Sequence, residues 1–136
     1  MSNPATLPAA AVVALLSGGN GLTAGTNLFA CAELPPDAIV PHKCVFAAEY
    51  DGPSPTPLIG VARDIRSMSV QVLVRGEPDK IDDTRTLAWA VWTALQRSTP
   101  TGYIDCLCNQ ANPTYLGKDD TEHFRFSINL TLRYEG

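Results

Sequence analysis

The amino-acid sequence predicts an α+β domain, in which a mainly antiparallel sheet of about four to five strands carries two helices on one face. Segments with the character of strands do not alternate regularly with helical ones, which excludes the doubly wound α/β class. The last segment, 124–134, alternates strictly between apolar and polar residues, which is typical of a strand with one buried face. The length of 136 residues fits one domain, 1–136.

The first third of the chain is expected to form a short helix followed by two strands. Thr6 fits the N-cap position and Pro8 the first turn, while the serine and glycines of 17–19 end the helix. Strands are expected at about 27–32 and 43–50. Apolar residues lie on both faces of the second strand, which favours an inner strand covered on both sides.

The middle of the chain is expected to hold a long loop, a strand and a longer helix. Residues 51–66 form the loop, and loops of this length tend to be functional. Residues 67–75 form a strand with one apolar face. The helix covers 80–97, with Asp79 as its N-cap and Arg97 in its last turn. Its apolar stripe consists of Ile81, Ala88, Val91, Trp92 and Leu95.

The end of the chain is expected to form a strand at about 103–109, a hairpin tip at 112–120 and the strand 124–134. In the last strand the apolar series is Phe124, Phe126, Ile128, Leu130, Leu132 and Tyr134. The polar series is His123, Arg125, Ser127, Asn129, Thr131 and Arg133. We expect the apolar face to pack on the stripe of the longer helix and the polar face to meet water.

The charge balance argues against nucleic-acid binding. The formal net charge is −4, from 10 Lys and Arg against 14 Asp and Glu, whereas binding to nucleic acid depends mainly on Lys and Arg at phosphates. The N-terminus lacks the positive region of a signal peptide, and the longest apolar run, 7–16, is too short to cross a bilayer. We therefore expect a soluble protein made in a cytoplasm, with no membrane partner.

Candidate catalytic residues are few. Nucleophilic catalysis needs a nucleophile beside a base that a third group orients, and the bases available are His42 and His123. No Gly-x-Ser-x-Gly nucleophile motif is present in the sequence. We therefore expect no catalytic residues and no enzymatic activity.

A metal site is the other chemical candidate. Cys106 and Cys108 would share one face of a strand, and His42 and Cys44 have the same spacing elsewhere. Zinc ligand pairs usually have a spacer of about two to four residues on a knuckle, whereas these pairs have one residue between them. Small buried thiols are therefore the simpler interpretation for these cysteines and for Cys31. We expect no metal and no cofactor. A small metal-binding or enzymatic cytoplasmic domain stays open as an alternative.

The order of the segments has a counterpart in a known family. A strand over 69–76 ends in Arg-Gly, and an acidic turn with a proline, 77–79, leads into the longer helix. The chain closes on the alternating strand 124–134. At its beginning, a short helix and a glycine-rich turn come before residues 27–29, and a second strand then begins near Cys44. This order, over nearly the whole chain, resembles the minor capsid and tail terminator, or tail completion, proteins of long-tailed bacteriophages.

The resemblance implies a mechanical role in the virion. Such proteins form a homo-oligomeric ring, typically a hexamer, on the last ring of the tail tube. The ring ends tube growth and provides the joint to the head connector. The implied partners are further copies of the chain, the tail tube protein and a head-completion or connector protein, while DNA passes through without sequence-specific binding. The implied location is the tail or neck of the virion, after synthesis in the cytoplasm of the host bacterium. Another neck or head-closure protein is the alternative.

Two predicted loops are expected to carry the contacts of this assembly. Prolines lower the ordering cost of 51–66 on docking, and opposite charges on this loop and on 109–122 would set the register between neighbours or against the tube. Trp is enriched at interface hot spots, so Trp89 is interpreted as an interface anchor or as a partly buried edge residue. Solvated hairpin tips are the alternative for the loops. The expected interface residues are Arg63, Asp64, Arg66, Trp89, Tyr115, Leu116, Lys118, Asp119 and Asp120.

Overall fold

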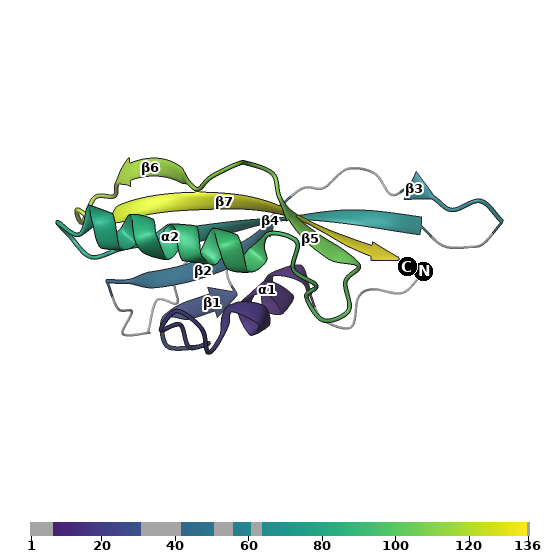
Figure 1. The fold of residues 1–136 in the computed structure, drawn as a ribbon, viewed down its shortest axis with the longest axis horizontal. Helices are drawn as coiled ribbons and strands as arrows, with labels where there is room; N and C mark the ends of the chain where they lie inside the picture. Colours follow the sequence, from purple (N-terminus) through teal and green to yellow (C-terminus); the bar gives the residue numbers. More distant parts are fainter. Residues whose placement is uncertain (1–6, 31–41, 51–55, 61–63, 136) are drawn as a thin grey trace.

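The computed structural model describes residues 7–30, 42–50, 56–60 and 64–135. These residues form an elongated sheet that carries two helices (Figure 1). In chain order the elements are α1 (Pro8–Leu16), β1 (Leu28–Ala30), β2 (Cys44–Tyr50), β3 (Thr56–Pro57), β4 (Asp64–Arg75), α2 (Ile81–Leu95), β5 (Asp105–Cys108), β6 (Thr114–Lys118) and β7 (Phe124–Glu135).

Within the described residues the sheet has seven strands, in the order β1-β2-β4-β7-β5, with β3 beside β4 and β6 beside β7. The pairs are antiparallel except for β1 and β2, which are parallel. The predicted α+β class and mainly antiparallel sheet are confirmed, with more strands than expected. The additional strands β3 and β6 lie in the segments predicted as loops and turns. They are short pieces on the edges of long strands, and such pieces show no clear periodic pattern in a sequence.

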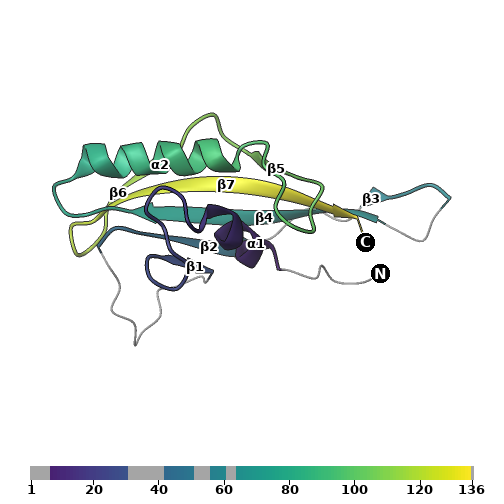
Figure 2. The same cartoon turned by 60° about the horizontal axis from the view of Figure 1, so that its bottom comes forward.

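The long strands β4 and β7, of 12 residues each, form the centre of the sheet. They pair antiparallel, with Val70 opposite Leu130 and Val72 opposite Ile128. These side chains are fully buried in the core that the sheet shares with the helices. Figure 2 shows both helices beside the central strands. The predicted alternation of β7 therefore identified the core face correctly.

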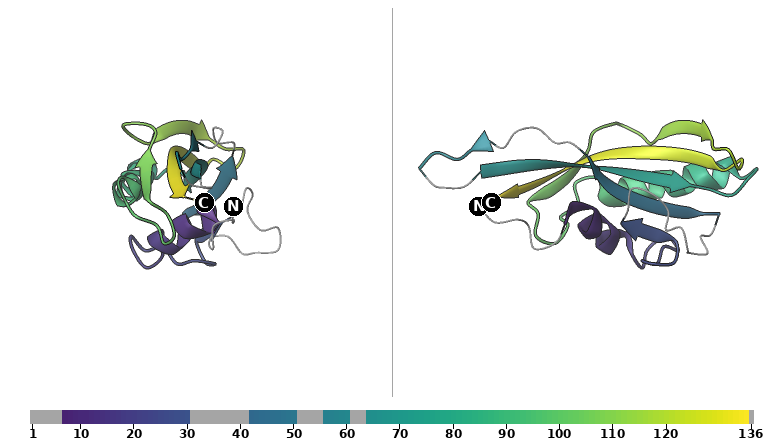
Figure 3. Two further views of the ribbon diagram at one scale, coloured as in Figure 1. Left: turned by 90° about the vertical axis from the view of Figure 1, so that its right-hand side faces the viewer. Right: turned by 180° about the vertical axis from the view of Figure 1, so that it is seen from behind.

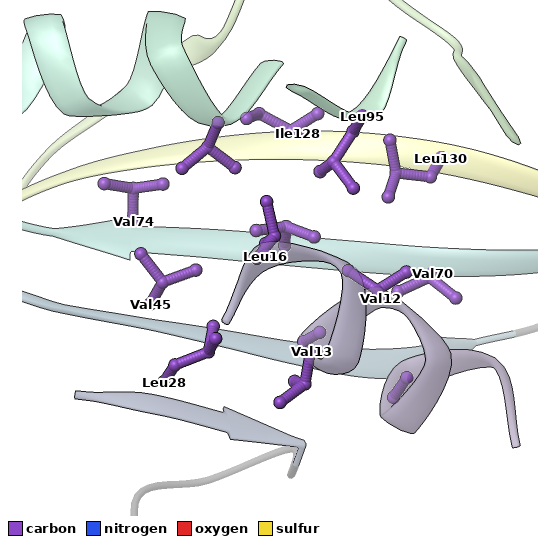
Figure 4. Close-up of a cluster of buried hydrophobic side chains, with 14 of the residues drawn as sticks. Val12, Val13, Leu16, Leu28, Val45, Val70, Val74, Leu95, Ile128 and Leu130 are labelled. Carbon is purple, nitrogen blue, oxygen red and sulfur yellow. The ribbon is translucent and has the colours of Figure 1, made fainter. Parts of the chain in front are cut away.

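Both helices cover the same face of the sheet, with α2 over β4, β5 and β7 and α1 over β1, β2 and β4 (Figure 3). Side chains from both helices and the central strands meet in one cluster, which includes Leu16, Leu95 and Leu130 (Figure 4). The predicted packing of α2 on β7 is thus confirmed for Ala88, Val91, Trp92 and Leu95, whereas Ile81 lies outside the cluster. Trp92 lies at the edge of this cluster, where its indole N–H donates to the Gln110 carbonyl oxygen at 3.0 Å.

The start of α1 is stabilised by a side chain from the sheet. The helix begins at Pro8, whose fixed φ suits the first helical turn. Leu7 occupies the N-cap position without a side-chain hydrogen bond, and the predicted cap, Thr6, lies outside the described residues. The Ala9 N–H donates to Glu49 Oε1 at 3.0 Å. A carboxylate from β2 therefore satisfies a free amide at the positive end of the helix.

The start of α2 differs from the prediction by one residue. Asp79, the predicted N-cap, adopts a φ of 61° and so belongs to the preceding turn. Lys80 takes the N-cap position and the helix begins at Ile81. Asp82 and Asp83 lie in the first turn as predicted, where negative charge is favoured.

The end of α2 comes earlier than predicted because the chain turns to meet β5. The helix ends at Leu95, and Gln96 Oε1 then accepts a hydrogen bond from the Cys108 N–H at 2.7 Å. The Arg97 N–H donates to the Cys106 carbonyl oxygen at 2.9 Å. Arg97 was predicted in the last turn of the helix, and this was wrong because its φ of 62° is not helical.

On the face of the sheet away from the helices, the side chains of β2 are more exposed than the sequence predicted. This strand lies between β1 and β4, so the prediction of an inner strand is confirmed. Val45 and Ala47 are buried in the core, whereas Phe46 and Ala48 on the other face are half-buried. The expected cover on both faces was wrong, because both helices of the described chain lie on one side.

The polar series of β7 is not uniformly exposed, which corrects a second expectation. His123 and Ser127 are buried. Ser127 lies between Leu73 of β4 and Thr114 of β6, its register partners, and both carry larger side chains than serine. The ring of His42 stacks on that of His123, with their centroids 4.9 Å apart.

Candidate assembly surfaces

At one end of the molecule a hairpin extends beyond the helices (Figures 1 and 3). It forms because β2 pairs with β4 only from Ser69 onward, while β3 pairs with the first residues of β4. We call residues 56–60 and 64–68 the arm. Ile59, in the turn after β3, is fully exposed at 103% of its reference surface. The arm therefore presents an apolar side chain to solvent on a projecting element.

The first half of α2 and β6 lie at the opposite end of the molecule (Figure 1). Residues of these two elements line a groove. Its volume is about 440 Å³. The residues that line it are Ile81, Arg85 and Trp89 of α2, Asn112, Pro113, Thr114 and Tyr115 of the β6 region, and Phe126 of β7. We call this the α2–β6 groove. Trp89 and Tyr115 keep 43% and 48% of their surfaces exposed, so the groove is open and presents two aromatic side chains among polar ones such as Arg85 and Asn112.

The aromatic rings of the groove are supported from behind. Trp89 meets Trp92 edge to face with centroids 5.8 Å apart, and Tyr115 lies 5.3 Å from the ring of Phe126. Such contacts hold large side chains in place, which lowers the entropy that they would lose on binding a partner. The structure thus brings together Trp89 and Tyr115, which were predicted separately as interface residues.

The predicted interface residues of the first loop lie on the arm. Asp64 and Arg66 belong to β4, so the expectation that 51–66 is a loop throughout was wrong for these positions. The pairing of Ile65 with Glu135 of β7 extends the central strands into the arm. Arg63 lies outside the described residues.

The predicted residues of the second loop lie around β6, at the other end of the molecule from the arm (Figure 1). Leu116 is exposed, as is Asp120. Lys118 Nζ lies 3.2 Å from Glu122 Oε2 and above the ring of Phe124. The opposition of charges between the two loops was expected between neighbouring copies or against the tube, so it stays a prediction.

The sequence from β2 to β7 matches a known protein family. The family model described as "Bacteriophage tail terminator protein" matches residues 47–135, which is more than half of the chain. The chain belongs to the bacteriophage tail terminator family. A comparison with curated proteins gave no match.

The family match confirms the resemblance seen in the sequence. The matched range of this tail terminator contains the arm, the α2–β6 groove and the central strands, whereas α1 and β1 precede it. The family consists of structural proteins of the phage tail, which agrees with the expectation of a non-enzymatic chain in the virion. No helix in the described part of the chain is long and apolar enough to span a membrane.

The two histidines of the tail terminator chain lie in contact, although 81 positions separate them. His42 Nδ1 is 2.7 Å from His123 Nε2, and His123 Nδ1 is 2.6 Å from Thr121 Oγ1. Asp119 Oδ1 accepts hydrogen bonds of 2.9 Å from the Thr121 hydroxyl and from the N–H groups of Thr121 and His123. No local spacing in the sequence predicts this network.

The directions of these hydrogen bonds argue against a catalytic role. A carboxylate only accepts, so the Thr121 hydroxyl donates to Asp119 and accepts from His123 Nδ1. His123 Nε2 then accepts from His42 Nδ1. A nucleophile needs a base that removes its proton, whereas here a protonated ring nitrogen faces the Thr121 oxygen. The network therefore orders the turn between β6 and β7.

Replacing Asp119 with asparagine is expected to reduce the acid sensitivity of folding. Burial alone would raise the pKa of Asp119, but hydrogen bonds from His123 and Thr121 outweigh it and lower the pKa from 3.8 to about 2. The pKa of Asp119 is lower in the folded protein than in the unfolded chain, so the ionised carboxylate stabilises the fold at pH values above the unfolded pKa. This stabilisation is lost as the pH falls through the folded-state pKa of about 2. Urea midpoints measured on descending from about pH 5 to about pH 2 should fall more steeply for the wild type than for the variant. The control is Asp120→Asn at the exposed neighbour, and equal slopes for Asp119→Asn and the wild type would refute the assignment.

The described cysteines behave as small apolar side chains. Cys44 and Cys106 are buried and Cys108 is half-buried, and none of these three forms a disulfide within the described residues, while Cys31 lies outside them. Burial raises the pKa of Cys106, and raises that of Cys108 to about 12. Within the described residues no group of three or more His, Cys, Asp and Glu side chains is arranged to hold a metal ion.

Proposed function

We propose that this chain forms a homo-oligomeric ring, expected to be a hexamer, on the end of the phage tail tube. The ring ends tube growth and provides the joint to the head connector. Its partners are further copies of the chain, the tail tube protein and a head-completion protein. The observation that carries this proposal is the match of residues 47–135 to the tail terminator family. We expect synthesis in the cytoplasm of the host bacterium, before assembly into the virion.

The distribution of charge supports passage of DNA through the ring. The net charge is −4, and the centre of the sheet face opposite the helices carries neutral side chains. Gln71 pairs there with Asn129, and Ser69 with Thr131. Hydroxyl and amide groups do not neutralise phosphates as Lys and Arg do. Such a surface suits a wall along which DNA slides without being held.

The test is removal of the gene from the phage or prophage genome that carries it. Tails should then grow to irregular and excessive lengths and fail to join heads, and the wild-type chain supplied in trans should restore both. Electron microscopy of induced lysates measures tail length and head attachment together. Tails of normal length without heads would assign the chain to head closure instead, and normal virions would exclude a role in the neck.

A further inference from the structure

We propose that the arm of one copy inserts Ile59 into the α2–β6 groove of the next copy, so that copies join head to tail. This inference rests on the proposed ring and names the two surfaces that would form it. Neither surface has a partner within the described part of a single chain.

The first step of the argument is the exposure of Ile59. Its side chain is completely exposed in the turn after β3, on an element that projects beyond the body of the protein (Figure 3). Leu58 beside it is half-buried. Removing apolar surface from water favours association. The arm therefore has the shape and the chemistry of a plug that another surface could receive.

The groove is the matching receptor. Trp89 and Tyr115 form exposed aromatic walls, and Phe126 and Ile81 add apolar lining. Arg85, Asn112 and Thr114 make the rest of the groove polar. Trp and Tyr are the residues most often found at the energetic centre of interfaces, where they line desolvated pockets. The rings of Trp89 and Tyr115 contact those of Trp92 and Phe126, which limits the rotamer entropy that they would lose on binding.

The relative placement of the two surfaces favours a ring. The arm and the groove lie at opposite ends of the long axis (Figures 1 and 3). A plug is complementary to a groove rather than to itself, so the contact is heterologous. Heterologous contacts build rings when the rotation between copies closes, and open filaments when it does not. A second copy of this chain therefore explains both surfaces at once.

Each of the two surfaces carries one acidic and one basic side chain, so opposite charges can pair across the contact. The arm carries Asp64 and Arg66, and the groove has Arg85 on its lining with Asp82 beside it. Within one chain Arg85 Nη1 lies 3.3 Å from Asp82 Oδ1, and both side chains are more than half exposed. Exposed pairs of this kind are weak and exchange partners readily. Arg85 can therefore turn to Asp64 of a neighbour when the arm docks.

The test compares full-length variants by analytical ultracentrifugation over a range of protein concentrations. The wild type should self-associate, and Ile59→Asp on the arm or Tyr115→Asp in the groove should abolish association. Ile104→Asp is the matched control, because Ile104 is exposed on the chain just before β5, outside both surfaces. Circular dichroism and urea unfolding establish that each variant is folded. A second set of variants tests the proposed pair of Asp64 with Arg85 of the next copy. Asp64→Arg or Arg85→Asp alone should weaken association, and the double variant should restore it because the two charges are then exchanged.

Mixing the variants gives the decisive result. The arm variant keeps a working groove and the groove variant a working arm, so the mixture should form a dimer of one copy of each and grow no further. Folded Ile59→Asp and Tyr115→Asp variants that associate like the wild type would overturn the arm–groove contact. So would a wild type that stays monomeric at every concentration. The role in ending tails would survive either result, since it depends on the gene-removal phenotype alone.

Discussion

Replacing Gly76 with alanine is expected to destabilise the domain by about 3 kcal/mol, because no room exists for a side chain there. A Cβ at Gly76 would lie 1.6 Å from Thr84 Oγ1 and 2.6 Å from Thr84 Cβ. The second distance does not depend on the rotamer of Thr84, so a side-chain rotation cannot relieve it. The Gly76 N–H also donates to the Phe124 carbonyl oxygen at 2.9 Å, which holds the glycine against β7. Only a shift of α2 away from the sheet would make space, and that shift would disturb the core.

Urea unfolding of single and double variants tests this contact. Thr84→Gly should destabilise the protein on its own, because glycine inside a helix costs about 1 kcal/mol. In the Gly76→Ala background it should instead recover stability, since it removes the three atoms nearest to the new Cβ. Gly19→Ala is the control, because a Cβ there meets only the Leu16 oxygen at 3.8 Å. Additive effects of Gly76→Ala and Thr84→Gly would contradict the close approach of β4 and α2.

Periodic patterns predicted the parts of the fold in which burial repeats regularly. The alternation over 124–134 identified the core face of β7, and the helical stripe ending at Leu95 identified the face of α2 that packs on it. Both patterns reflect burial repeated over many residues, so an error at one position does not hide them. The same reasoning failed at His123 and Ser127, because their burial depends on neighbours distant in the sequence.

The boundaries of α2 depended on contacts that no local pattern contains. Arg97 looks like a favourable cation in the last helical turn, yet its N–H pairs with Cys106 on β5. Asp79 looks like an N-cap, yet its backbone enters the left-handed region and the helix begins two residues later. In both cases tertiary hydrogen bonding or turn geometry outweighs a local preference worth about 1 kcal/mol.

The sequence allowed some residues of the assembly surfaces to be predicted, but not how these residues are arranged in space. Trp89 and Tyr115 were selected for their residue types and their segments, and nothing in the sequence placed them around one groove. Ile59 was not selected at all, because the segment 51–66 was treated as a loop with charges at its end. Its significance depends on the pairing of β3 with β4, which carries this isoleucine away from the body. A two-residue strand such as β3 is too short to be recognised from alternation.

Truncating Phe126 to alanine is expected to cost about 3–5 kcal/mol, which is the usual range for a buried phenylalanine. Phe126 is 4% exposed and pairs with Val74 on one side and Tyr115 on the other, so the cavity would open in the middle of the sheet. Stabilities of domains are commonly about 5–15 kcal/mol, so this single change could remove a large part of the total. Urea unfolding should show a lower midpoint, and Gln71→Ala on the open face of β4 should stay within about 0.5 kcal/mol of the wild type.

Phe126 also connects the stability of the domain to the proposed contact between copies. Its ring supports Tyr115, which forms a wall of the α2–β6 groove. Phe126→Leu keeps most of the buried apolar volume but removes the aromatic support, so it should cost less stability than the alanine variant. We expect the folded Phe126→Leu protein to associate more weakly than the wild type while Ile104→Asp does not. If Phe126→Leu associates as strongly as the wild type, Tyr115 needs no support from the core. If Phe126→Ala is as stable as Gln71→Ala, the apolar face of β7 is assigned wrongly.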